Sequence, residues 1–145
     1  MDQELKRQII MEHYTHPKNR QKTIDKDYIK VNTANESCID NLDIFIKINN
    51  DIIEDILFEG EACAISISST SIMIENLIGM NIKDAKTYIE NFSNMINEKE
   101  YDKDILKDAI VYDNIYKQNS RKSCAYLPYR GIIEAIDKYE KSEKR

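Results

Sequence analysis

The hydrophobic pattern of this chain changes its period at Gly60, and that change constrains the fold more than any other feature. Before it, apolar residues alternate with polar ones over 42–48, the period of a strand with one buried face. After it, apolar residues recur at helical spacing from Ala64 onward. Cys63 therefore falls at a strand-to-helix junction, where unpaired N–H groups and the helix dipole favour a thiolate.

Three stretches have strand patterns and follow one another in the chain: 28–32, 42–48 and 52–58. The turn residues 49–51 separate the last two, which predicts a hairpin. Only helical periodicity follows Gly60. We therefore expect an α+β fold, in which helices pack around one three-stranded antiparallel sheet, and a single domain over residues 1–145.

Helical spacing predicts an N-terminal helix that ends at Pro17 and four helices after the sheet. These four are expected at 64–78, at 81–96, at 102–112 and from near Tyr126 or Leu127 to the charged tail. Pro128 fits the first turn of a helix, so we expect the last helix to begin near Tyr126 or Leu127. Residues 113–122 are polar and are expected to form a surface loop. Cys124 would then lie just before a helix N-terminus, as Cys63 does.

Composition excludes several classes of function. Hydrophobic residues make up 41% and charged residues 32% of the chain, the balance of a globular protein. No apolar run approaches about 18 residues and no signal peptide is recognisable, so we expect a cytoplasmic protein without a membrane partner. A net charge of −5 without a basic block, apart from a short tail, disfavours nucleic acid as a partner.

The three cysteines form the strongest chemical signal in the sequence. An odd number in a reducing compartment favours metal binding or thiol chemistry over disulfides. Cys38 lies in a polar loop with Asp40 two residues on, and Cys63 and Cys124 lie at the predicted junctions. Three thiolates and a carboxylate suit tetrahedral zinc, which the fold would have to assemble because the spacings exceed those of a zinc knuckle. The alternative, three unrelated buried cysteines, fits poorly with the polar neighbours of Cys38.

Two other groups of polar side chains receive a structural interpretation. His13 and His16 flank the end of the first helix, where histidines often satisfy carbonyl groups, and no spacing motif supports a metal role. The second group is a run of serines in the helix after Cys63, which we expect to allow close packing against the sheet: Ser66, Ser68, Ser69 and Ser71.

Over nearly its whole length the sequence resembles the IscU/SufU-type iron–sulfur cluster assembly scaffolds, and most closely their SufU-type sulfur-transfer branch. The resemblance lies in five stretches: Ile9 to Tyr14 with Pro17 and Asn19, Asn35 with Cys38 and Asp40, Phe58 to Ser66, an insertion with Asn94-Met95 and Asp104, and Ser120 to Ala125. The IscU type has a histidine before its last cysteine, where this chain has Ser123. The sequence also departs from the family pattern at Gln21, Glu36, Ile39 and Pro128, and none of these departures removes a ligand.

The resemblance implies an SufE/IscU-like fold and a zinc ion held by Cys38, Asp40, Cys63 and Cys124. It implies a carrier that takes persulfide sulfur from a SufS-type cysteine desulfurase, which holds the pyridoxal phosphate, and delivers it to iron–sulfur scaffold or acceptor proteins. Cys38 is the expected sulfur acceptor, because its polar loop can move at low cost, and Arg121 would stabilise its thiolate. Two alternatives stay open: a scaffold that builds a [2Fe–2S] cluster on these ligands, and a structural zinc protein that only binds partners.

Overall fold

A three-stranded antiparallel sheet forms one layer of the structure, a computed structural model that describes residues 1–36 and 38–143. Its strands are β1 (Ile29–Ala34), β2 (Asn41–Asn49) and β3 (Ile52–Glu61), in the order β1-β2-β3. In the part of the chain described, every element after β3 is helical. The α+β prediction is confirmed, and so is the change of period that defined it.

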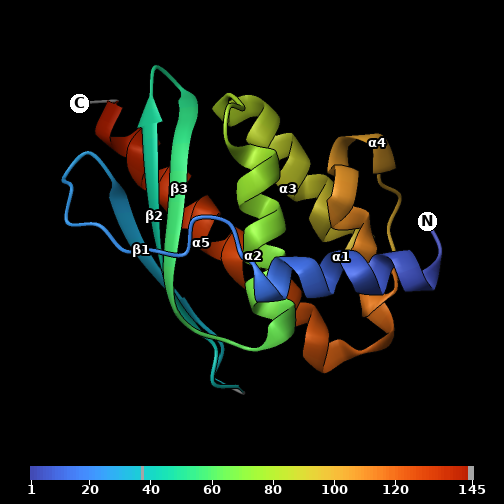
Figure 1. Cartoon of the computed structure of the whole chain (residues 1–145). Helices are drawn as coiled ribbons and strands as arrows, with labels where there is room; N and C mark the ends of the chain where they lie inside the picture. The colour runs from blue at the N-terminus through green and yellow to red at the C-terminus, as the bar shows by residue number, and fades with distance from the viewer. Residues whose placement is uncertain (37, 144–145) are drawn as a thin grey trace.

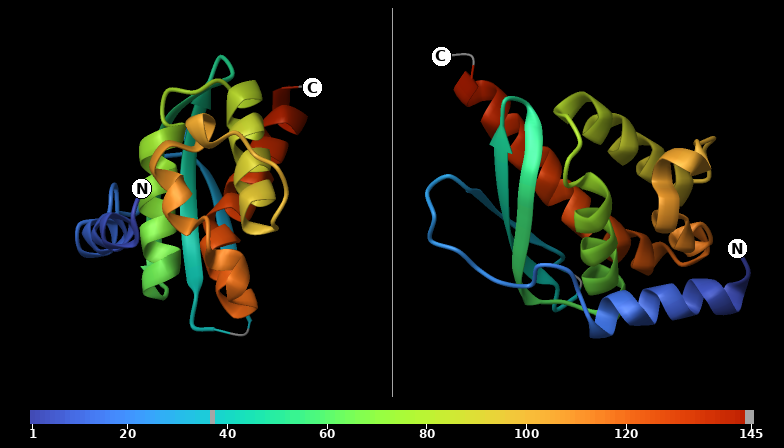
Figure 2. Two further views of the ribbon diagram at one scale, coloured as in Figure 1. Left: turned by 90° about the vertical axis from the view of Figure 1, so that its right-hand side faces the viewer. Right: turned by 45° about the horizontal axis from the view of Figure 1, so that its top comes forward.

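The helices lie on one side of the sheet (Figures 1 and 2). Their bounds are α1 (Gln3–Thr15), α2 (Ala64–Leu77), α3 (Ile82–Ile96), α4 (Lys103–Leu106), the 3-10 helices η1 (Lys107–Tyr112) and η2 (Ile115–Lys117), and α5 (Asn119–Glu143). α5 runs behind the strands in Figure 1 and packs directly on them: a Cβ on Gly131 would lie 2.8 Å from Ile44 Cδ1. α2 lies beside α5, so these two helices and the sheet enclose the core.

β3 runs three residues beyond the predicted end at Phe58 and delivers the chain to Cys63. Gly60 pairs with Leu42 inside the strand and has a φ of +134°. A Cβ at this position would stand 2.2 Å from the carbonyl oxygen of Asn41, so only glycine fits against the neighbouring strand. This close approach holds the end of β3 beside the start of β2, and Asp40 is the residue just before β2.

Two of the predicted helices differ in the structure. The expected helix over 102–112 is a single α-helical turn followed by a 3-10 segment, because Lys107 adopts a φ of +50° that interrupts the helix. The segment 113–122, predicted as a surface loop, contains η2 with a buried Ile115 and the first turn of α5. The other helix predictions agree more closely, and the Asn81 side chain caps α3 by accepting a hydrogen bond from Asp84 N at 2.8 Å.

The predicted start of the last helix, near Tyr126 or Leu127, is wrong. α5 begins at Asn119, so Pro128 lies in its interior and Cys124 lies within the helix, not ahead of it. A proline has no N–H to donate to the carbonyl four residues earlier, which here belongs to Cys124. The Ser66 hydroxyl of α2 lies 3.0 Å from that carbonyl oxygen, and one turn on the Ser69 hydroxyl lies 2.6 Å from the carbonyl oxygen of Ala125. Donors from the neighbouring helix thus allow α5 to continue through the proline.

None of the helices in the described residues combines the length and the apolar character needed to cross a membrane.

Candidate metal centre

The four side chains predicted as metal ligands come together at one end of the sheet. Cys38 and Asp40 lie between β1 and β2, Cys63 lies between β3 and α2, and Cys124 lies on α5. One ligand atom from each falls within 4.8 Å of every other. Residues from three separate parts of the chain therefore face a common point.

Asp40 is at the centre of the cluster and is 1% exposed, although it lies in a segment that the sequence marks as a polar loop. Its Oδ1 accepts a hydrogen bond from Cys63 N at 2.7 Å, and its Oδ2 accepts one from the Ser66 hydroxyl at 2.7 Å. Burial alone raises the pKa of this carboxyl, but the hydrogen bonds from Ser66, Cys63 N–H and the Cys124 and Cys38 thiols outweigh it and hold the pKa below its usual value. Asp40 is therefore a carboxylate at neutral pH, with lone pairs left for a cation.

The distances within the cluster suit a zinc ion. Zn–S bonds of 2.3 Å and Zn–O bonds of about 2.1 Å at tetrahedral angles put sulfur and oxygen ligands about 3.6 Å apart. Cys38 Sγ lies 3.5 Å from Asp40 Oδ1, and Cys63 Sγ lies 3.7 Å from Asp40 Oδ2. Three sulfur donors and one carboxylate also match the ligand preferences of zinc and of iron–sulfur clusters. Donor set and spacing therefore both fit the predicted metal.

Cys63 is the N-cap residue of α2, as the sequence predicted for a strand-to-helix junction. Its φ and ψ of −70° and 168° are those of an extended residue, and its carbonyl accepts the hydrogen bond of Ile67 N at 3.0 Å. Its thiol does not cap the helix. The side chain is therefore fixed by the backbone on both sides while its sulfur stays available to the centre.

Cys124 is the most enclosed of the three thiols, with 2% of its surface exposed. Burial is the largest cause, and together with the neighbouring Cys63 and Asp40, beside which a second negative charge is unfavourable, it raises the pKa of this thiol to about 12. Without a cation this sulfur keeps its proton at neutral pH. A bound cation would supply the opposite charge that the thiolate needs.

Cys38 is held less firmly. Among the described residues of its loop, Asn35 N donates a hydrogen bond to the Asp40 carbonyl at 3.0 Å, and Cys38 N donates one to the Asn35 carbonyl at 3.1 Å. Cys38 is partly exposed, and the adjacent Ile39 is 71% exposed. The loop therefore holds Asp40 at its buried end, while Cys38 is half-buried beside the exposed Ile39. Ser37, which precedes it, lies outside the described residues.

The serines of α2 do more than allow close packing, which is what the sequence suggested. Ser66 is fully buried and contacts Asp40, the Cys124 carbonyl and, at 3.5 Å, the Cys63 sulfur. Ser68 bonds the Tyr112 hydroxyl and Ser69 the Ala125 carbonyl. The position of Ser66, three residues after the N-cap cysteine, was the signal available in the sequence, because residues so spaced share a helix face.

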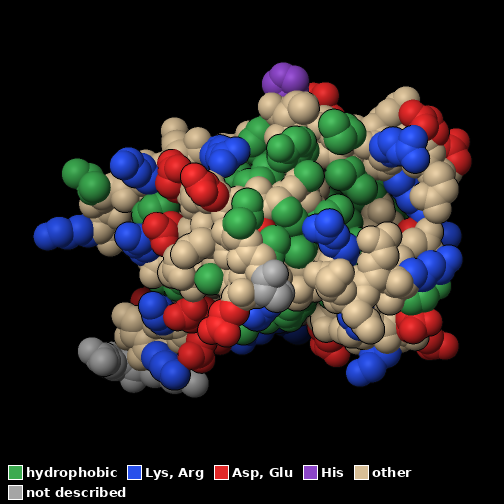
Figure 3. Space-filling view, turned by 90° about the horizontal axis from the view of Figure 1, so that it is seen from below, with side chains coloured by type: hydrophobic (Ala, Val, Ile, Leu, Met, Phe, Trp, Pro, Cys, Tyr) green, Lys and Arg blue, Asp and Glu red, His purple; other side chains and the backbone are tan. Residues whose placement is uncertain are grey.

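Arg121 lies one turn before Cys124 on α5 and is exposed. With Cys63, Ile10, Ile65 and other residues it lines a hollow of about 470 Å³. Apolar side chains gather on the underside of the molecule (Figure 3). The guanidinium makes no ion pair with any residue of 1–36 or 38–143. A free cation and an apolar opening therefore adjoin the Cys63 side of the centre.

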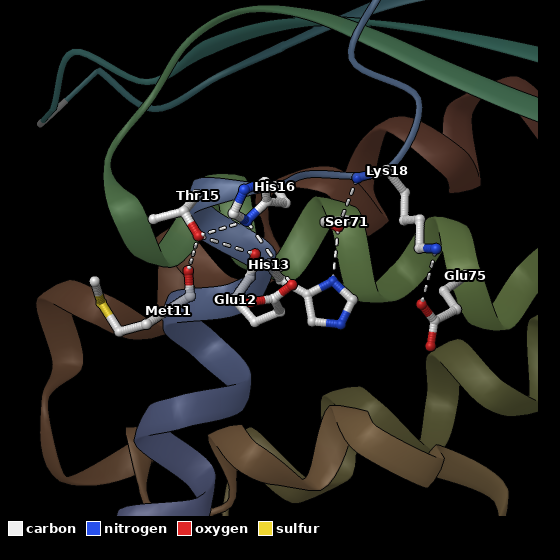
Figure 4. Close-up of polar contacts among 8 residues, drawn as sticks. All are labelled: Met11, Glu12, His13, Thr15, His16, Lys18, Ser71 and Glu75. Atoms are coloured by element: carbon white, nitrogen blue, oxygen red, sulfur yellow. Dashed lines mark hydrogen bonds and ion pairs between the residues drawn. The ribbon is translucent and has the colours of Figure 1, made fainter.

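His13 and His16 lie at the end of α1 and do not belong to the cluster of Cys38, Asp40, Cys63 and Cys124. Figure 4 shows the polar contacts of these two histidines. His13 Nδ1 is 2.7 Å from the Ser71 hydroxyl, which also accepts a hydrogen bond from Lys18 N at 2.9 Å. Glu75 and Asp108 come within 4.8 Å of His13, but Glu75 also faces Lys18 Nζ at 3.8 Å. His13 thus joins α1 to α2 and to the segment after α1, through a serine hydroxyl and not through the helix-end carbonyls that the sequence suggested.

Comparison with known proteins identifies the family of the chain. Residues 5–145 match the family described as NifU-like N terminal domain. The chain is 37% identical to the zinc-dependent sulfurtransferase SufU of Bacillus subtilis, covering 94% of this chain and 92% of that protein. It is 29% identical to the iron–sulfur cluster assembly scaffold protein IscU of Thermotoga maritima, covering 89% of this chain and 90% of that one.

Solved structures show the same fold. A putative iron–sulfur cluster assembly scaffold protein for the SUF system from Fervidobacterium islandicum superposes with a TM-score of 0.84 at 31% identity, covering 88% of this chain and 93% of the other. The N-terminal part of a NifU-like protein from Brucella abortus reaches 0.84 at 16% identity, covering 92% of both chains, which supports the fold alone. On the match over residues 5–145 and the similarity to SufU, this chain belongs to the NifU-like N-terminal domain family.

Proposed function

We propose that this protein is a zinc-dependent sulfur carrier, which accepts persulfide sulfur from a cysteine desulfurase and passes it on for iron–sulfur cluster assembly. The observation that carries the proposal is the convergence of Cys38, Asp40, Cys63 and Cys124 at zinc-like spacing. The similarity to SufU, a zinc-dependent sulfurtransferase, supports it independently. Bound zinc would hold the thiols as thiolates at neutral pH.

Cys38 is the residue we assign as sulfur acceptor. Its thiolate would attack the outer sulfur of the desulfurase persulfide, so that a new S–S bond forms on Cys38 while the old one breaks and leaves a cysteine thiolate on the desulfurase. No net oxidation or reduction is needed. The partial exposure of Cys38 supports the assignment, whereas Cys124 is buried with a raised pKa and Cys63 is fixed at the cap of α2. A thiolate leaves a metal most easily from the most weakly held segment.

Arg121 and the hollow around it are the proposed meeting point with the desulfurase. Its guanidinium has no ion-pair partner in the described chain and can stabilise a thiolate released from the centre. The apolar lining, with Ile10 and Ile65 beside Cys63, offers a surface for a docked partner. When Cys38 leaves, a side chain of that partner, such as a histidine, would take the open ligand position.

The test is to mix the zinc-loaded protein with a cysteine desulfurase and L-cysteine, alkylate without reductant, and locate the persulfide by mass spectrometry. We expect it on Cys38 and expect Cys38→Ala to abolish stimulation of the desulfurase. Ile39→Ala is the matched control, because it changes the same loop at an exposed position that offers no ligand. Persulfide on Cys63 or Cys124 with Cys38 unmodified would refute the assignment.

Arg121 is tested separately. Arg121→Gln should reduce sulfur transfer and leave zinc content unchanged, since the guanidinium contributes charge and no ligand atom. Lys122→Gln removes the neighbouring cation as a control. A loss of zinc in Arg121→Gln, or equal transfer by both variants, would contradict the role.

A cluster scaffold is the second candidate, favoured by the similarity to IscU of Thermotoga maritima. Three sulfur ligands and a carboxylate can hold iron as well as zinc. Metal analysis and a visible absorption spectrum of freshly isolated protein separate the two. Zinc without visible absorbance supports the carrier, and iron with sulfide-to-iron charge-transfer bands supports the scaffold.

A further inference from the structure

We propose that Ser66 is a positioning residue of the metal centre and that Pro128 sets how strongly it acts on Asp40. The inference rests on the proposed zinc centre and concerns a residue that offers no ligand in it. Ser66 is fully buried on α2, and its hydroxyl lies 2.7 Å from Asp40 Oδ2 and 3.0 Å from the Cys124 carbonyl oxygen. It thus contacts Asp40 just before β2 and Cys124 on α5, and its oxygen also lies 3.5 Å from the Cys63 sulfur, so it contacts three of the four predicted ligand residues.

The hydroxyl has one proton for its two oxygen acceptors. A carboxylate is the stronger acceptor, since a charge-assisted hydrogen bond is about twice as strong as a neutral one. The carbonyl nevertheless competes, because it is buried and because a buried acceptor without a donor is costly. The proton is therefore shared, and the hold of Ser66 on Asp40 is weaker than its 2.7 Å separation alone would give.

Pro128 is the origin of this competition. In an uninterrupted helix the N–H of residue 128 would occupy the Cys124 carbonyl, and the Ser66 proton would belong to Asp40 alone. Proline removes that N–H, so a residue four positions from the ligand Cys124 affects Asp40 through Ser66. The same helix pair provides a comparison one turn on, where Ser69 bonds the Ala125 carbonyl at 2.6 Å and touches no ligand side chain.

The hydrogen bond fixes the carboxylate before metal binds. Oδ1 is held by Cys63 N–H and Oδ2 by Ser66, so both oxygens are directed, which fixes rotation about the carboxylate bond. Groups that orient a ligand in this way typically change metal affinity by about 10- to 100-fold when they are removed. Ser66 thereby keeps Asp40 in place, and this leaves Cys38 as the ligand that can depart.

The experiment measures zinc affinity in the absence of any desulfurase, by competition with a chromophoric chelator. Ser66→Ala should bind zinc about 10- to 100-fold more weakly than the parent. Ser69→Ala, which removes the analogous contact between α2 and α5, should stay within about threefold of it. Pro128→Ala should bind about 2- to 10-fold more tightly, the range of one neutral hydrogen bond. That gain should vanish in the double variant Ser66→Ala/Pro128→Ala, because Pro128 acts only through the hydroxyl.

Circular dichroism and thermal unfolding of each variant show whether it is folded. A folded Ser66→Ala that binds zinc as tightly as the parent, or an equal loss in Ser69→Ala, overturns the positioning role. A Pro128→Ala effect that persists without the hydroxyl overturns the proposed route through Ser66. A parent that binds zinc as predicted but takes no persulfide sulfur refutes the proposed function and leaves the role of Ser66 standing.

Discussion

Gly60→Ala should damage both the fold and the metal centre, and the structure gives the size of the effect. The new Cβ would meet the Asn41 carbonyl oxygen at 2.2 Å and Leu42 Cα at 3.1 Å, so the backbones of β2 and β3 must separate. Overpacking of this kind costs about 1–3 kcal/mol. A side chain at φ +134° adds about 1–3 kcal/mol of backbone strain. Together we expect a loss of about 2–6 kcal/mol in the free energy of unfolding.

The matched control is Gly79→Ala. Gly79 also has a positive φ, +95°, but nothing lies within 4 Å of a Cβ placed there. Gly79→Ala introduces backbone strain without a steric clash, so its free energy of unfolding should fall by about 1–3 kcal/mol. It lies at the end of α2 that is remote from Cys63, and zinc affinity should not change.

Urea unfolding of the metal-free proteins measures the loss in the free energy of unfolding, and chelator competition measures the change in zinc affinity. At about 2–4 °C per kcal/mol for a chain of this size, Gly60→Ala should also lower the melting temperature by roughly 4–24 °C. Its zinc affinity should also fall. Asp40 lies two residues before Leu42 and Cys63 lies three residues after Gly60, so separating this residue pair would move both predicted ligands. If Gly60→Ala is as stable as Gly79→Ala, or if it binds zinc like the parent, the close approach of the two strands does not position the centre.

Three further predictions concern the ligands. Cys63→Ser should lose most of the zinc in metal analysis, whereas Asp40→Ala should keep some because three thiolates remain; equal zinc in Cys63→Ser and the parent would reject the ligand set. The metal-free protein should lose stability between pH 9 and 10, because the buried Cys124 keeps its proton up to about pH 12 while the unfolded chain releases it near pH 9. Urea unfolding at pH 8, 9 and 10 measures how the free energy of unfolding changes with pH. If Cys124→Ser shows the same pH dependence as the parent, Cys124 is not its origin. Chelating the metal should lower the melting temperature, since ligands from three parts of the chain are joined only when it is bound, and a transition independent of zinc concentration would exclude that linkage.

The sheet and most of the helices could be predicted from the sequence because each depends on local information. The period of two in β2 and the N-cap at Asn81 are set by neighbouring residues, and both appear in the structure. The start of α5 could not be predicted in this way. The missing hydrogen bond at Pro128 is compensated by Ser66, which lies on another helix. A local rule for proline cannot include a donor that only the tertiary fold supplies.

The candidate site divides along the same line. The thiols and the carboxylate could be named from residue type and setting, since few arrangements other than a metal centre require such groups together. The burial of Asp40 and the role of Ser66 could not be predicted. The sequence around Asp40 is polar, and a serine in a helix usually serves only as a small residue that allows close packing. Both follow from the meeting of the β1–β2 loop with α2 and α5, contacts between residues far apart in the chain.

The way each thiol is attached determines what it can do in the proposed sulfur transfer. Moving Cys124 would disturb α5, which packs on the sheet through Gly131, and moving Cys63 would break the first turn of α2. Moving Cys38 strains the hydrogen bonds of Asn35 with Asp40 and Cys38 in the loop, while Asp40 remains held by Cys63 N–H and Ser66. The predicted centre therefore combines three anchored side chains with one less firmly held sulfur. A carrier needs this asymmetry, because the sulfur must leave the metal to accept its cargo while the remaining ligands retain the ion.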